Sequence, residues 1–458
     1  MDITNLLSPQ VPHTKNLIDS IHLNGFAFDA SPTGTGKTYC AGSVAKNINL
    51  PVVVICPKVA KKTWSDTLKL FGINPYLVIN YEKLIRGNTP YYTFNKKEYV
   101  ECKHWWLSGG ISVKLPMPSL VILDECHKCK GNKSKNGELL VAIKNAGHKI
   151  LLLSATAATN VIEMRNFGYS TNLHLGKDFY SFAREHGAEN DNYGGLTWNK
   201  DNTDAKTGMK QIHNTLFNQY KCASKMQIKD FGNIFPDNRV IAESFDLGSD
   251  TNKKLQDVYD KMQDELAMLD ERAKNYSEHV FAIIMKARRH SELLKVPTTT
   301  EWIEERCDEG ISPVVFFNFT DSLESVERKL SSKFKGLITK IVGGQTEKQR
   351  NTEIEEFQSN KRRIVLANMN AGAAAISLHD TDGNYPRHSL ICPSWSAILT
   401  IQALGRIYRA NGKSPCIQKF LFASDIEERQ RSRVADKVKN ISELNDGDLS
   451  LTETITLY

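Results

Sequence analysis

The chain has 458 residues, of which 40% are hydrophobic and 24% are charged, and its formal net charge is +7. These proportions are typical of a globular protein, and the length exceeds what one core supports, so we expect two domains of roughly 200 residues each. No stretch of about 18 apolar residues and no signal peptide is found, so we expect neither a membrane-spanning nor a secreted protein. The positive charge weakly favours a polyanionic partner.

The first predicted site is a loop at residues 31–38, with the sequence Ser-Pro-Thr-Gly-Thr-Gly-Lys-Thr. The apolar residues 26–28 before it predict a strand, and residues 39–47 after it predict a helix. A glycine-rich loop between a strand and a helix is the context that phosphate binding requires. The strict pattern has glycine where Ser31 stands, and an ordinary glycine turn is the alternative.

The residue types of this loop suit a nucleoside triphosphate. Gly34 and Gly36 allow backbone N–H groups to approach the phosphates, while Lys37 reaches the β and γ oxygens. The hydroxyl of Thr38 can ligate Mg²⁺. The candidate nucleotide-binding residues are Pro32, Thr33, Gly34, Thr35, Gly36, Lys37 and Thr38.

Adjacent carboxylates follow the apolar run 120–123, in the sequence Asp124-Glu125-Cys126-His127. A buried strand that ends in this way can hold Mg²⁺ with Asp124 and polarise an attacking water with Glu125, because phosphoryl transfer needs positioning and charge neutralisation more than covalent chemistry. Together with the loop, this pattern predicts hydrolysis of a nucleoside triphosphate.

The nine cysteines are odd in number and scattered along the chain. This usage favours reduced thiols in a cytosol-like compartment over a disulfide framework. Cys126 and Cys129, with Cys102 and His104 upstream, form an alternative pattern for zinc. We favour the carboxylate interpretation, because Cys126 and His127 belong to that motif.

Short apolar runs alternate with helical segments along the chain, which predicts an α/β fold with two parallel sheets. The runs lie at residues 26–28, 52–56, 120–123, 150–153, 314–317, 364–367 and 389–392. We expect lobe one at about 1–240 and lobe two at about 241–458. Residues 251–295 predict long helices at the junction, and their heptads are too few for a coiled coil.

Two segments are predicted to be insertions. Residues 88–119 mix aromatic and basic side chains, so Trp105 and Trp106 could stack on bases while lysines grip a nucleic-acid backbone. The alternative, which we favour, is a small hairpin whose aromatic residues cover lobe one. Residues 186–210 have few apolar positions and predict a flexible surface loop.

Further segments follow one another in an order that resembles the superfamily 2 helicases, whose two lobes are RecA-like. They are 52–58 followed by Trp64, 78–81, 151–156, 314–320, Ala371-Gly372 and 402–409. Within the superfamily, residues 402–409 resemble the QAxGRxxR segment of the Swi/Snf-type DNA translocases. Ser394-Trp395-Ser396 and Ile426-Glu427-Glu428 also resemble segments of that branch. The resemblance covers nearly the whole chain.

The resemblance implies that MgATP is held on lobe one and that Arg406 and Arg409 reach it from lobe two. It implies that Gln402 senses the γ-phosphate or connects to the opposite lobe, and that the hydroxyls of 154–156 couple the carboxylates to DNA. The positions near the nucleic-acid track of the family are matched by Lys58, Asn80, Thr320 and Gly372.

Two departures from the family pattern affect these expectations. Thr14, a further candidate nucleotide-binding residue, stands where many relatives have a glutamine that reads adenine, which weakens the case for adenine selectivity. Residues 373–375 are alanines where the family has a glycine-rich segment, so two positions lose conformational freedom. Coupling between DNA contact and hydrolysis could be altered there.

We therefore expect a DNA-dependent ATPase that translocates on or remodels DNA, with ATP and Mg²⁺ as cofactors. Double-stranded DNA is the expected partner, RNA is the alternative, and separate proteins would direct targeting. A strand-separating DNA or RNA helicase and a slow nucleotide-gated DNA clamp are the rival functions. The expected compartment is the cytoplasm or the nucleoid, and the compact layout would suit a virus, phage or mobile element inside a host cell.

Overall fold

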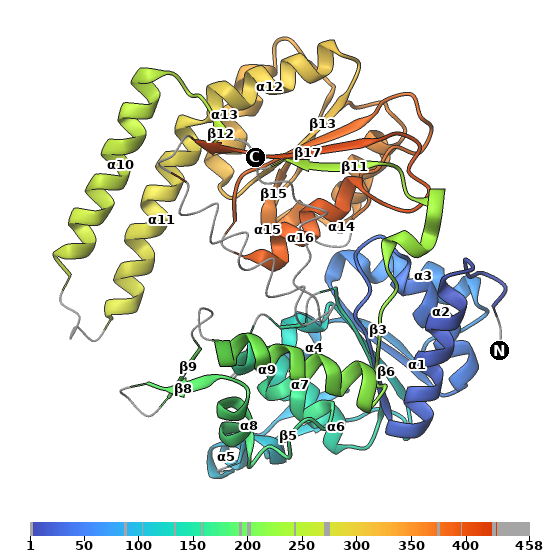
Figure 1. The fold of residues 1–458 in the computed structure, drawn as a ribbon. Helices are drawn as coiled ribbons and strands as arrows, with labels where there is room; N and C mark the ends of the chain where they lie inside the picture. The colour runs from blue at the N-terminus through green and yellow to red at the C-terminus, as the bar shows by residue number, and fades with distance from the viewer. Residues whose placement is uncertain are drawn as a thin grey trace. The chain divides into compact units, whose positions relative to one another are not determined.

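The computed structural model describes residues 3–86, 89–102, 104–131, 134–155, 157–158, 160–191, 195–198, 203–241, 244–269, 275–372, 376–394, 396–423 and 427. The chain forms two compact units, the first running to Asn233 and the second beginning at Ile234 (Figure 1). Among the described residues, no helix is long and apolar enough to cross a membrane.

The first unit is built on a six-stranded sheet in the order β10-β1-β7-β6-β2-β3, and all neighbouring strands in it are parallel. The strands are β1 (Phe26–Asp29), β2 (Val52–Cys56), β3 (Leu77–Asn80), β6 (Leu120–Asp124), β7 (Lys149–Leu153) and β10 (Ala223–Ser224). The central strands read as continuous apolar runs because helices cover both faces of a parallel sheet.

The helices of this unit lie on both sides of the sheet, with α1 and α2 on one side and α6, α7 and α9 on the other (Figure 1). Those that connect or cover strands are α1 (Gln10–Asn24), α2 (Lys37–Ile48), α3 (Lys61–Leu70), α4 (Tyr81–Ile85), α6 (Lys135–Asn145), α7 (Met164–Ser170), α8 (Phe179–Glu185) and α9 (Thr203–Asn214). This arrangement confirms the predicted α/β fold.

The aromatic segment after residue 88 forms a small antiparallel hairpin of β4 (Tyr92–Phe94) and β5 (Ile111–Val113). Between these strands lie α5 (Lys96–Glu101) and the 3-10 turn η2 (Trp105–Leu107). The hairpin is the alternative that the sequence favoured. A role in gripping nucleic acid stays a prediction.

The segment 186–210 is more ordered than the sequence predicted. A two-stranded antiparallel ladder joins β8 (Ala188–Asn190) to β9 (Leu196–Trp198), and α9 begins at Thr203. The prediction of a loop throughout this segment was wrong, because Trp198 and the buried Met209 pack against lobe one and fix the local structure.

The second unit is also built on a six-stranded parallel sheet, in the order β11-β17-β16-β13-β15-β14. Its strands are β11 (Asn238–Ile241), β13 (Ser312–Phe317), β14 (Ile338–Ile341), β15 (Ile364–Asn368), β16 (Arg387–Ile391) and β17 (Cys416–Phe420), and β12 (Ser244–Phe245) pairs separately with β18 (Phe422–Ala423). The chain thus enters this sheet just before residue 240, near the expected boundary.

Two long helices, α10 (Ser249–Ala267) and α11 (Tyr276–Leu294), pack side by side at the start of this unit (Figure 1). They confirm the long helices predicted for residues 251–295. The remaining helices are α12 (Val296–Asp308), α13 (Thr320–Leu330), α14 (Glu347–Gln358), α15 (Met369–Gly372) and α16 (Ala397–Ile407).

Candidate functional site

The sheet of the first unit brings motifs from distant parts of the sequence to one edge. The phosphate loop follows β1, Ser154 follows β7 and Asp124 ends β6, and these three strands are neighbours. Because the carboxyl ends of parallel strands meet at the same edge, the three groups converge there. The structure therefore assembles the loop and the carboxylates as one candidate nucleotide site.

The phosphate loop is a tight turn closed by the chain's own hydrogen bonds. Gly34 and Gly36 have φ angles of 89° and 86°, which residues with a Cβ rarely adopt. The ammonium of Lys37 donates to the carbonyl oxygens of Ser31 and Pro32 at 2.8 and 3.1 Å. The loop leads into the N-terminus of α2, where backbone N–H groups and the helix dipole favour an anion.

A buried polar cluster holds the start of the loop. The Asp29 carboxylate accepts the backbone N–H of Ser31 at 2.9 Å and lies 3.1 Å from Nε2 of His13. The other ring nitrogen of His13 lies 2.9 Å from Oγ of Ser224 on β10. Burial acts to raise the pKa of Asp29, but His13, the charge of Lys37 and the hydrogen bonds outweigh it and hold the pKa below its ordinary value.

Helix α1 also holds the end of the loop, through Gln10. Its side-chain amide donates to the carbonyl oxygen of Thr35 at 2.8 Å and accepts the backbone N–H of Leu7 at 2.8 Å. A Cβ on Gly36 would lie 2.3 Å from the Gln10 amide nitrogen, so a larger residue there would displace the Gln10 side chain. Thr14, which we expected at the nucleotide, has no exposed surface and lies inside lobe one.

Asp124 is held by two aromatic side chains. The indole N–H of Trp64 donates to its carboxylate at 2.8 Å, and the Tyr81 hydroxyl donates to its backbone carbonyl at 2.9 Å. Burial, with the neighbouring charge of Glu125, raises the pKa of Asp124 to about 6, while Trp64 and the charge of Lys37 act the other way. Two adjacent carboxylates are the donor set that a hard cation such as Mg²⁺ fits.

Glu125 is linked to the next strand end by His127. Glu125 has a φ angle of 54°, so the chain turns sharply at this residue. Nδ1 of His127 lies 3.3 Å from the Glu125 carboxylate and 3.2 Å from the Ser154 hydroxyl. This contact fits the expected link between the carboxylates and residues 154–156, of which Thr156 lies outside the described residues.

The zinc alternative gains no support from the structure. Within the described ranges, no group of three or more His, Cys, Asp or Glu side chains is arranged to hold a metal ion. Burial raises the pKa of the Cys129 thiol to about 12, and it also raises that of Cys126. Zinc binds the thiolate, which burial disfavours here.

In the second unit, the two candidate arginines meet at one backbone carbonyl. Arg406 donates from Nη1 to the oxygen of Ile376 at 3.1 Å, and Arg409 donates from Nη2 to the same oxygen at 2.8 Å. Nε of Arg406 also donates to the carbonyl of Gln402 at 2.8 Å. Arg406 and Gln402 are 1% and 5% exposed. Trp395 and residues 373–375 lie outside the described residues.

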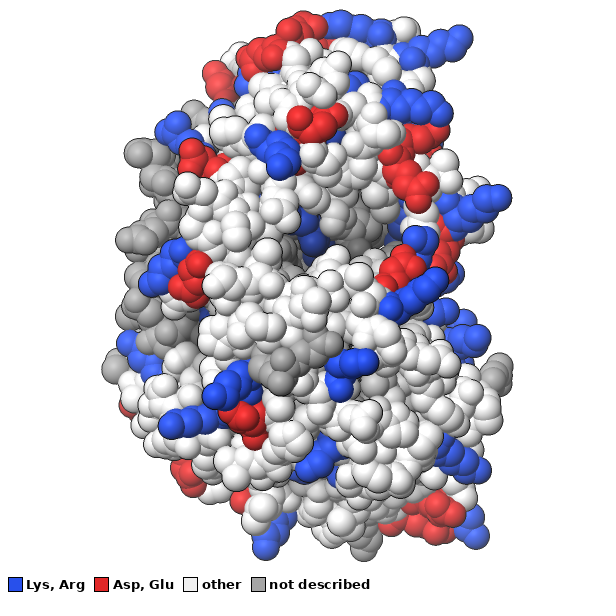
Figure 2. Space-filling view, turned by 90° about the vertical axis from the view of Figure 1, so that its right-hand side faces the viewer, with Lys and Arg blue, Asp and Glu red and all other residues white. Residues whose placement is uncertain are grey.

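The candidate nucleic-acid contacts also follow strand ends. Lys58 follows β2 and Asn80 ends β3, and these strands pair, whereas Thr320 follows β13 and Gly372 follows β15, which pair in the second unit. Lys58 is exposed, while the Asn80 amide donates to Glu82 at 2.7 Å. Figure 2 shows Lys and Arg interspersed with Asp and Glu on one face, rather than gathered into a single basic patch.

Trp105 and Trp106 lie against the helices of lobe one. The Trp105 ring makes edge contacts with Tyr169 at 5.7 Å and Phe179 at 6.4 Å between centroids. The guanidinium of Arg165 lies 4.4 Å from the same ring. Both tryptophans are half-buried.

Several residues of the site were not found in the sequence. For the pair of Asp29 and His13, the sequence held one signal: Asp29 is a carboxylate directly after an apolar run, at a position expected to be buried. Trp64 was noted only as a family match, and its hydrogen bond to Asp124 spans 60 positions of the chain. No local pattern predicts such a pair.

Comparison with known proteins assigns the chain to a family. Residues 296–411 match the helicase conserved C-terminal domain. A protein of Acanthamoeba polyphaga mimivirus, which carries the provisional name ATP-dependent RNA helicase, is 30% identical over 457 residues, covering 96% of this chain and 83% of the relative.

Two solved structures are also similar. The Sulfolobus solfataricus SWI2/SNF2 ATPase core in complex with dsDNA has a TM-score of 0.37 at 16% identity, with 98% of this chain and 95% of that chain covered. An S. cerevisiae protein bound to RNA and ADP BeF3 has a TM-score of 0.49 at 9% identity, with 95% and 92% covered. On the strength of the viral relative and the helicase domain, the chain belongs to the superfamily 2 helicases and translocases, enzymes that hydrolyse ATP.

Proposed function

We propose that this enzyme is a DNA-dependent ATPase that translocates on or remodels double-stranded DNA. The observation that carries the proposal is the segment 402–409, which matches the Swi/Snf-type pattern and spans the C-terminal half of α16 and the two residues after it. Its two arginines converge on the carbonyl of Ile376, so they are placed as a pair. A paired arrangement suits groups that must reach one phosphate together.

ATP is held by the phosphate loop of lobe one. Lys37 exchanges its contacts with loop carbonyls for the β and γ oxygens, and backbone N–H groups at the start of α2 bind the remaining charge. Thr38 and Asp124 would hold Mg²⁺, which supplies charge neutralisation when bound. Glu125 orients the attacking water, and His127, whose Nδ1 lies 3.3 Å from the Glu125 carboxylate, holds that carboxylate in place.

Hydrolysis depends on arginines supplied by lobe two. A guanidinium that engages the transferring phosphate mainly in the transition state contributes roughly 10³ to 10⁵ in rate. Arg406 and Arg409 have this role in the proposal. DNA that contacts residues of both lobes favours the state in which these arginines act, so DNA stimulates turnover.

An RNA-directed activity is the second candidate, because the mimivirus relative carries the name of an RNA helicase. The two candidates share the ATP chemistry and differ in the nucleic acid that stimulates it. ATP turnover is therefore measured with double-stranded DNA, single-stranded DNA and RNA, beside displacement of a third strand from a triplex and unwinding of a tailed duplex.

The proposal predicts that double-stranded DNA gives the largest stimulation and that the triplex strand is displaced without duplex unwinding. Glu125→Gln serves as the control that binds nucleotide without hydrolysing it. Stimulation by RNA alone, or unwinding of the tailed duplex, would assign the enzyme to the second candidate or to a strand-separating helicase. Binding without stimulated turnover by any nucleic acid would favour the nucleotide-gated clamp.

A further inference from the structure

Helix α11 carries a polar stripe on the face that packs into lobe two. Its members Arg288, Ser291 and Glu292, continued by Lys295 directly after the last residue of the helix, are spaced so that they share one side, and the four are 8%, 3%, 6% and 4% exposed. A helix that packs against a core usually buries an apolar stripe instead. Burying charge is costly unless the charged groups have partners inside the protein.

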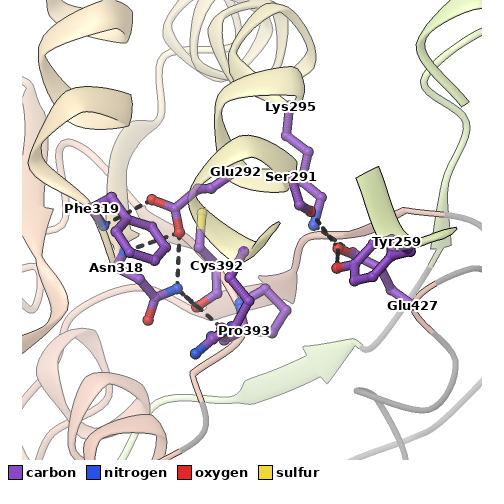
Figure 3. Close-up of a pocket in the computed structure, with 10 residues that line it drawn as sticks. Tyr259, Ser291, Glu292, Lys295, Asn318, Phe319, Cys392, Pro393 and Glu427 are labelled. Carbon is purple, nitrogen blue, oxygen red and sulfur yellow. Dashed lines mark hydrogen bonds and ion pairs between the residues drawn. The ribbon is translucent and has the colours of Figure 1, made fainter. Parts of the chain in front are cut away.

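Two residues of the stripe, Ser291 and Lys295, hold the two long helices to the chain after β18. Glu427 accepts hydrogen bonds from the hydroxyls of Tyr259 at 2.8 Å and Ser291 at 2.6 Å, and it forms an ion pair with Lys295 (Figure 3). Burial acts to raise the pKa of Glu427, but Lys295 and the hydrogen bonds outweigh it and lower the pKa. Ser291 and Lys295 are therefore both paired with Glu427 and anchor α11.

Another residue of the stripe, Glu292, holds the N-terminus of α13. The Glu292 carboxylate accepts the backbone N–H groups of Asn318 at 3.1 Å and Phe319 at 3.0 Å, and the Asn318 side-chain amide at 2.9 Å (Figure 3). These residues directly precede Thr320, the first residue of α13. A carboxylate at a helix N-terminus interacts favourably with the helix dipole, so Glu292 fixes where α13 begins.

The same residues also hold the chain that leads into α16. The Asn318 amide donates to the carbonyl oxygens of Pro393 at 3.0 Å and Cys392 at 3.3 Å, and Arg288 donates to the Pro393 carbonyl at 2.7 Å. Ser396, a few residues later, caps α16 through the backbone N–H of Leu399. Glu292, Asn318 and Arg288 therefore join the start of α13 to the entry of α16.

We propose that Glu292, with Asn318 and Arg288, couples the position of the start of α13 to the position of the chain that enters α16. This inference rests on the proposed function, in which Thr320 contacts nucleic acid and α16 carries Arg406, with Arg409 two residues after the helix. A displacement of Thr320 by nucleic acid is then transmitted through two side chains to the helix that bears Arg406. Nucleic-acid contact and arginine placement become linked within one lobe.

The first test is independent of nucleic acid and measures amide hydrogen exchange in the intact protein. Glu292→Gln leaves one acceptor oxygen where three N–H groups now bind, so it should raise exchange at both 318–322 and 396–400. Asn318→Ala, which removes only the bridging amide, should raise exchange at 396–400. The matched control is Glu278→Gln, the same change at an exposed position of α11. Faster exchange at 318–322 alone in both variants would overturn the proposal.

The second test measures ATP turnover with and without saturating nucleic acid. Glu292→Gln and Asn318→Ala should each lower the stimulated rate at least fivefold, while the basal rate of each stays within about twofold of the wild type. An equal fall in both rates, or a lower melting temperature with an unchanged ratio, would reduce these residues to a structural role. If the wild type itself is not stimulated, the proposed function fails, while the exchange test still decides whether the two helix starts are joined.

Discussion

Trp105 offers the sharpest test of whether the aromatic hairpin is a structural cover or a nucleic-acid grip. Its ring is half-buried, makes edge contacts with two rings of lobe one and lies 4.4 Å from the Arg165 guanidinium. Truncating a fully buried Trp to Ala costs about 3 to 5 kcal/mol. Half-burial reduces this, so we expect Trp105→Ala to lower the free energy of unfolding of lobe one by roughly 2 kcal/mol.

The assay is urea unfolding followed in parallel with DNA affinity on the same preparation. Leu107→Ala is the control, because Leu107 belongs to the same turn but is 58% exposed, and a surface change of this kind stays within about 0.5 kcal/mol. Stacking on a base contributes about 1 to 3 kcal/mol, so loss of a grip residue would weaken DNA binding by about 5-fold to 150-fold. Unchanged stability of lobe one with such a loss of DNA affinity would refute the structural interpretation.

Three further predictions concern the site and the core. Lys37→Ala should lose nucleotide affinity, whereas Glu125→Gln should keep it and lose turnover; equal affinity losses in a nucleotide titration would contradict separate roles. Arg406→Ala should cut stimulated turnover at least tenfold and leave ATP affinity within a few fold, and steady-state kinetics that show an unchanged stimulated rate would rule out the arginine role. His174, buried among aromatic rings, has its pKa lowered by burial to about 4 from 6.5. Folded His174 thus binds its proton less tightly than the unfolded chain does, so up to about 3 kcal/mol of stability, complete above pH 6.5, should be lost as the pH falls towards 4. His174→Gln should flatten the unfolding free energy across that window, and parallel pH profiles would contradict this assignment.

The features that the sequence predicts well are those that depend on a few neighbouring residues. Continuous apolar runs predict strands buried on both faces, and the glycines of the phosphate loop predict a turn that only glycine tolerates. The carboxylates at the end of β6 are predicted in the same way. The placement of α10 and α11 follows from helix-forming composition over a long window.

The features that the sequence hides are contacts between distant residues. Glu292 looks like any charged residue on a solvated helix face, and only the fold shows that it is buried against the start of α13. The pairing of His13 with Asp29 likewise depends on how α1 packs beside β1. Polar side chains carry no local signal of burial, which is why the positions that hold the site were missed.

The lysine of the phosphate loop has a consequence for how the site discriminates among anions. In this structure its ammonium is bound to two loop carbonyls, at 2.8 and 3.1 Å, so an incoming anion must displace contacts that already exist. Hydrogen bonds from a charged donor contribute roughly 1.5 to 3 kcal/mol each. A triphosphate that engages several backbone N–H groups at once offsets this loss, whereas a single phosphate does not. With ATP bound as proposed, we therefore expect the loop to favour the nucleotide over inorganic phosphate and other small anions.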